Sequence, residues 1–116
     1  MYRLAYSEVA SDGLKEHRYS ERQVLLKSIN MMERAEQLGM NSLEAIEATH
    51  FVTRLWCHLI DDLGGPDNSL AIELRAQLIS IGLFMIKTAD EIRNGKQTSF
   101  RSMIEITASI AEGLEG

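Results

Sequence analysis

The apolar residues of this chain recur every three or four positions, and no stretch alternates strictly between apolar and polar residues. Such a recurrence places apolar side chains on one face of an α-helix, whereas alternation is typical of a strand. Turn-forming residues interrupt the pattern at four places, 11–13, 39–42, 64–69 and 94–99. The sequence therefore predicts an all-α fold, a single four-helix domain over residues 1–116 whose short connections make sequential helices roughly antiparallel.

The first two helices have recognisable start and stop signals. The first is expected to begin at Leu14 or Ser20 and to end at Leu38, before a glycine that can adopt a left-handed conformation. The second is expected to open at Asn41, whose side chain can cap the free amides while Glu44 reaches back as in a capping box.

The last two helices are bounded by similar signals. The third is expected to start near Asn68 or Ser69 and to end at Asn94, just before a glycine. The fourth is expected to start after Thr98 or Ser99.

The apolar stripes of the second and third helices predict where the core lies. Trp56 lies on the stripe of the second helix and has the largest apolar side chain of the chain, so we expect it at the centre of the packing. The residues expected in the core are Leu55, Trp56, Leu59, Leu74, Leu78, Ile81 and Gly82.

The third helix is apolar nearly all round, because it carries a second stripe about 140° from the first. Such a helix is either enclosed by its own chain or lends one face to a partner, and the pattern alone leaves both interpretations open. On the second interpretation the partner-binding residues are expected to be Phe51, Ile79, Leu83, Ile86, Phe100 and Met103.

Composition narrows the range of functions. Twelve Lys and Arg against seventeen Asp and Glu give a net charge of -5, and the cations are not clustered as a phosphate backbone requires. The longest apolar run, 78–86, is far shorter than the roughly 20 residues that span a bilayer. The first residues lack the pattern of a secretion signal, so we expect a cytoplasmic protein without direct nucleic-acid binding or membrane insertion.

The chain offers few groups for chemistry. His58 with Asp61 and Asp62 resembles part of a metal site, but adjacent Cys57 is turned away by about 100° and no second ligand pair follows. No nucleophile elbow, phosphate-binding loop or triad occurs. We therefore expect no catalytic residue, no metal and no cofactor.

A series of short motifs, in order along nearly the whole chain, resembles the FlaF family of flagellin-synthesis regulators. The motifs are Tyr6, Glu21-Arg22, Leu55-Trp56, Leu59 through Leu63, Asn68-Ser69-Leu70, Leu74-Arg75-Ala76, Leu78 through Gly82, Gly95, Ser99-Phe100, Ile104-Glu105-Ile106 and Gly113-Leu114. Ala71 and Thr107 depart from the family pattern, where a Pro and an Asn are expected. The run Leu78 through Gly82 with the upstream Leu55-Trp56 is the most specific part.

The resemblance implies a flagellar accessory protein that promotes flagellin synthesis and export in opposition to the translational repressor FlbT. The expected mechanism is chaperoning, in which a helical groove shields the amphipathic terminal helices of unexported flagellin. FlbT and the flagellar export gate are further candidate partners. Two alternatives stay open, a regulator that acts directly on flagellin mRNA and a structural helical adapter without chaperone activity.

Overall fold

The all-α fold predicted from the sequence is confirmed. A computed structural model describes the backbone of residues 11–113 and the side chains of residues 20–113, and this part of the chain contains helices and no strand. The helices are α1 (Ser11–Leu38), α2 (Leu43–Leu63), α3 (Ile72–Arg93) and α4 (Arg101–Gly113). Helix α1 therefore begins earlier than either predicted start.

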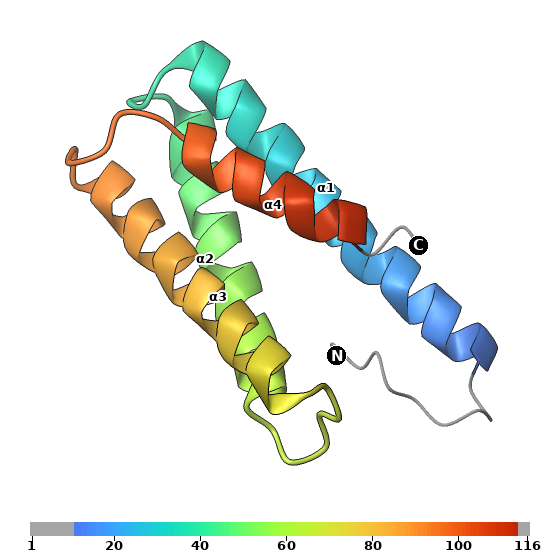
Figure 1. Cartoon of the computed structure of the whole chain (residues 1–116). Helices are drawn as coiled ribbons and strands as arrows, with labels where there is room; N and C mark the ends of the chain where they lie inside the picture. The colour runs from blue at the N-terminus through green and yellow to red at the C-terminus, as the bar shows by residue number, and fades with distance from the viewer. Residues whose placement is uncertain (1–10, 114–116) are drawn as a thin grey trace.

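The helices pack in a chain of neighbours. The close pairs are α2 with α3, α1 with α2, and α1 with α4. Figure 1 shows α2 and α3 as an antiparallel hairpin, while α4 runs back along α1. The first turns of α1 extend past the end of α4. Helix α3 is thus supported mainly from one side, by α2.

Two further predicted helix starts are wrong. Ser42, and not Asn41, caps α2, because its side chain accepts a hydrogen bond of 3.1 Å from the amide of Ala45. Helix α3 starts at Ile72, later than predicted. Asn68 instead shapes the preceding turn, where its Oδ1 accepts a 3.1 Å hydrogen bond from the amide of Leu70.

A carboxylate from α1 holds the start of α4. The Glu36 side chain accepts hydrogen bonds of 2.7 Å from both the Phe100 amide and the Ser99 hydroxyl. The Ser99 hydroxyl in turn accepts a 3.0 Å bond from the Arg101 amide. The Phe100 amide at the start of α4 is thereby satisfied by a residue 64 positions away, and the Arg101 amide is satisfied by Ser99.

The core centres on the contact between α2 and α3. Trp56 is 2% exposed, and an added Cβ at Gly82 would lie only 2.7 Å from its ring and 2.9 Å from Ile60. Only glycine therefore permits α3 to lie this close to the indole. Around this contact the buried apolar side chains include Leu59, Leu63, Leu78, Met85 and Ile92.

The other residues expected in the core differ in how deeply they are buried. Leu55 and Ile81 are half-buried and pack against the core. Leu74 is exposed, because it lies near the start of α3. The neighbouring Arg75 there reaches the end of α2, and its Nη1 donates a 3.3 Å hydrogen bond to the Leu63 carbonyl.

We expect Gly82→Ala to lower the free energy of unfolding by about 1–3 kcal/mol, because the new methyl group must displace a buried ring. Gly113→Ala is the matched control, since a Cβ at that helical position meets nothing within 4 Å. Urea unfolding followed by circular dichroism measures both. Equal midpoints for the two variants would contradict the close approach of α2 and α3.

Candidate functional site

An exposed apolar strip runs along α3. Leu83 is 58% exposed, while Ile79 and Ile86 are half-buried and pack against the edge of the core. These three residues, hereafter the α3 strip, share one helix face because they are four and three positions apart. The face about 100° around the helix provides the buried Leu78, Gly82 and Met85. The two stripes read from the sequence therefore correspond to one core face and one partly open face.

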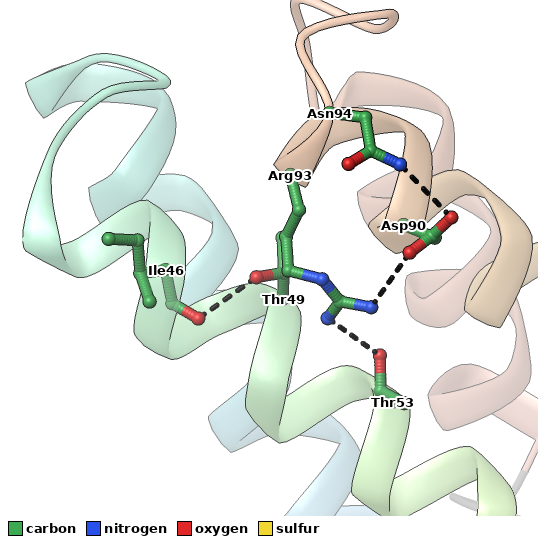
Figure 2. A network of polar contacts seen from close by, with 6 residues as sticks. All are labelled: Ile46, Thr49, Thr53, Asp90, Arg93 and Asn94. Atoms are coloured by element: carbon green, nitrogen blue, oxygen red, sulfur yellow. Dashed lines mark hydrogen bonds and ion pairs between the residues drawn. The ribbon is translucent and has the colours of Figure 1, made fainter.

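A polar cluster closes the C-terminal end of this face. Arg93 donates from Nη2 to Asp90 Oδ1 over 3.2 Å and from Nη1 to Thr53 Oγ1 over 3.4 Å (Figure 2). Asn94 donates a 3.3 Å hydrogen bond to the other Asp90 oxygen. Asp90 and Arg93 continue the helical spacing of Ile86, so the α3 strip ends in charges, and Thr53 links it to α2.

The one aromatic residue of α3, Phe84, escaped the sequence prediction. Phe84 is 41% exposed and lines a shallow hollow with Lys87, Thr88 and Glu91, which the α4 residue Ser102 borders. Phe84 belongs to neither apolar stripe, so helical periodicity gave no reason to single it out. Its ring adds apolar surface next to Leu83 in sequence, on the side of α3 towards α4.

Phe51 does not join the α3 strip. Its half-buried ring lies 5.2 Å from the ammonium nitrogen of Lys27 on α1, a cation–π contact. The hollow beside it is lined by Val24, Arg54, Leu55 and His58, all from α1 or α2. The structure thus places Phe51 on the flank of α2 that faces α1, away from the predicted groove.

Phe100 and Met103 are core residues. Both side chains are 0% exposed, because α4 packs this face against α1. Phe100 is further held through its amide by Glu36. The groove predicted from the sequence therefore loses these two members, and the α3 strip is what remains accessible.

A different hollow contains a buried acid. Glu21 is 3% exposed and borders an apolar recess, hereafter the Glu21 hollow. The apolar residues that line it are Val24, Leu25, Leu55, Trp56, Leu59, Leu63, Leu78 and Ile110. Burial raises the pKa of Glu21 to about 8, and the carboxylate of Asp62 adds to this rise.

The burial of Glu21 is indicated by its spacing in the sequence. Glu21 precedes Leu25, Ser28, Met32 and Ala35 at helical spacing, and all four are buried. An acidic residue on a core stripe is the pattern that predicts an ionisable group in the interior.

Among the side chains that the structure describes, no group of three or more His, Cys, Asp and Glu could hold a metal ion. Cys57, His58 and Asp61 are exposed. Across residues 11–113, none of the helices has the length and apolar character needed to cross a bilayer.

The comparison with protein families decides the identity. The family model described as "Flagellar protein FlaF" matches residues 2–114, nearly the whole chain. The chain belongs to the FlaF family. No curated protein and no solved structure matches it. Membership of FlaF associates the chain with the flagellum.

The pKa of Glu21 predicts how stability depends on pH. The folded state holds the proton up to about pH 8, whereas the unfolded chain releases it near pH 4.5. The contribution is thus fully present below the unfolded pKa and is lost as pH rises through the folded one. We expect Glu21→Gln to gain stability over the wild type by on the order of a few kcal/mol between about pH 5 and about pH 9.

Urea midpoints of both proteins at the two pH values test this expectation. Glu33→Gln is the matched control, because it removes the same charge at an exposed position of α1. Parallel pH profiles for Glu21→Gln and wild type would show that the carboxyl group is not held protonated.

Proposed function

We propose that this FlaF-family chain promotes flagellin synthesis and export in the cytoplasm by binding unexported flagellin as a secretion chaperone. In this role it acts in opposition to the translational repressor FlbT. The observation that carries the proposal is the α3 strip, a partly open apolar face on a helix that is packed mainly against one neighbour. FlbT and the export gate are further proposed contacts.

The chemistry of the strip suits an amphipathic helix. Such a partner anchors apolar side chains at three- and four-residue spacing, which is the spacing of Ile79, Leu83 and Ile86. The polar cluster of Asp90, Arg93 and Thr53 at one end supplies the polar rim that such sites use to set register. The terminal helices of unassembled flagellin have this amphipathic character, as the family resemblance implies.

Burial of the α3 strip can be compared with the binding energy that a functional complex needs. Complete burial of one large aliphatic side chain is worth about 1.5–3 kcal/mol, and a micromolar complex needs about 8 kcal/mol. Leu83 starts 58% exposed, but Ile79 and Ile86 are already half-buried and contribute less. The strip therefore supplies part of the affinity, and Phe84, 41% exposed, is positioned to add to it.

Leu83→Glu is expected to abolish flagellin binding while the free domain stays folded, because the charge replaces a side chain that is 58% exposed. Calorimetric titration with full-length flagellin measures binding, and thermal melting by circular dichroism measures folding. Gln77→Glu is the matched control, since it adds the same charge at an exposed position about 120° around α3. A folded Leu83→Glu protein with wild-type affinity would remove the strip from the site, and an unfolded one would return it to the core.

The identity of the bound segment is tested separately. We expect flagellin that lacks both terminal helical regions to lose its affinity for the wild-type protein, because its central part has no exposed amphipathic helix to offer. Titration of full-length and doubly truncated flagellin makes the comparison. Equal affinities would rule out the chaperone mechanism while leaving a flagellar role intact.

A further inference from the structure

The α3 strip is part of a longer heptad pattern, hereafter the α3 seam. The members of the seam are Ile72, Ala76, Ile79, Leu83 and Ile86, at successive intervals of four, three, four and three residues. An average interval of about 3.5 residues keeps such side chains on one face along a helix, as in the seam of a coiled coil. The seam extends over roughly 21 Å of α3.

The α3 seam is largely open to solvent. Ile72 is 71% exposed, Leu83 is 58% exposed, and Ala76 between them is also exposed. Among the described helices, α3 packs closely on α2 alone. Exposed aliphatic side chains at heptad spacing form the pattern that a second helix covers by inserting its own side chains between them.

Two oppositely charged residues flank the seam. Glu73 directly follows Ile72, and Lys87 directly follows Ile86, so both lie beside the same edge of the seam. Both are exposed, and neither forms an ion pair or a hydrogen bond with another side chain of residues 20–113. The seam therefore has a negative group near its N-terminal end and a positive group near its C-terminal end.

A second copy of α3 that runs antiparallel is complementary in shape to this seam. In one register, Leu83 of one copy packs against Ile79 of the other. The same register sets Ile86 of one copy against Ala76 of the other, so a large side chain meets a small one. Because the pair has two-fold symmetry, each of these contacts occurs twice.

The antiparallel register also brings unlike charges together. Glu73 of each copy lies beside Lys87 of the other, which gives two ion pairs along the edges of the seam. A parallel pair would place each of Glu73, Lys87 and Asp90 beside the same residue of the other copy, and like charges repel. The charges therefore favour a second copy of this chain as the occupant, and they favour the antiparallel orientation.

We propose that this chain forms a two-fold symmetric homodimer through the α3 seam, with the two α3 helices antiparallel. The contact is short, so the dimer forms and dissociates with protein concentration. The dimer itself does not depend on flagellin binding. Since Leu83 is also proposed to bind flagellin, the second copy covers the α3 strip until flagellin displaces it, and only this consequence rests on the proposed function.

Sedimentation velocity of the full chain over a concentration series, without flagellin, tests the proposal. We expect a reversible equilibrium between monomer and dimer. Glu73→Lys and Lys87→Glu are each expected to raise the dissociation constant of the dimer by roughly tenfold, because two ion pairs become two repulsive contacts. The double variant Glu73→Lys/Lys87→Glu restores unlike charges and is expected to return to within about twofold of the wild type.

Glu33→Lys is the matched control, because it changes the net charge as Glu73→Lys does, at an exposed position of α1. This control is expected to keep the dissociation constant of the wild type. Leu83→Glu sets carboxylates within the seam and is expected to be monomeric at every concentration. Circular dichroism checks folding, and if Leu83→Glu unfolds, the charge reversals at exposed positions decide alone.

Three results would overturn the proposal. A wild type that is monomeric at every concentration shows that the seam does not bind a second copy. A dimer that persists in folded Leu83→Glu protein is formed through another surface. A double variant that dissociates as readily as the single variants shows that Glu73 and Lys87 do not meet, which excludes the antiparallel register. None of these results bears on whether flagellin binds, which the separate titration measures.

Discussion

The close contact between Gly82 and the Trp56 indole is the constraint on which the arrangement of this domain depends. Because the glycine has no side chain, α3 settles against α2 at a distance that any other residue would prevent. The large indole is thereby covered and is only 2% exposed. The positions of Leu78 and Met85 on either side of the glycine follow from this contact.

The same contact determines which surface stays open. Because the face of α3 that contains Gly82 packs against α2, residues about 100° around the helix reach only the edge of the core. Ile79 and Ile86 therefore remain half-buried and Leu83 exposed. The apolar strip is a geometric consequence of a hydrophobic helix that packs mainly against a single neighbouring helix.

Much of this architecture could be predicted from periodicity, because helix spacing and glycine stops are local properties. The all-α fold and the two faces of α3 follow from them. The N-cap of α2 was misplaced because Asn41 and Ser42 have similar intrinsic capping preference, and the choice depends on the turn that precedes them. The start of α3 was misplaced because the Asn68 side chain accepts a hydrogen bond within the preceding turn and does not cap the helix.

The candidate site was harder to predict, because exposure depends on which helices meet. Phe100 and Met103 have apolar patterns that suit either a groove or a core, and only the packing of α4 on α1 assigns them to the core. Phe51 was expected to line the groove, but its neighbour Lys27 lies on another helix, so the contact between them could not be read from local spacing. The burial of Glu21 could have been predicted, because Glu21 lies four residues before Leu25 and therefore on the same helix face.

The hydrogen bonds between the Glu36 carboxylate and the start of α4, hereafter the clasp, affect the order in which the domain can assemble. Helices α1, α2 and α3 meet through short connections, whereas the clasp joins positions 36 and 100 and closes a loop that costs roughly 3–4 kcal/mol in chain entropy. Helix α4 packs most closely on α1, the partner across that loop. The docking of α4 is thus the helix contact that spans the largest separation along the chain and carries the highest cost of loop closure, and burial of Phe100 and Met103 in the core offsets that cost.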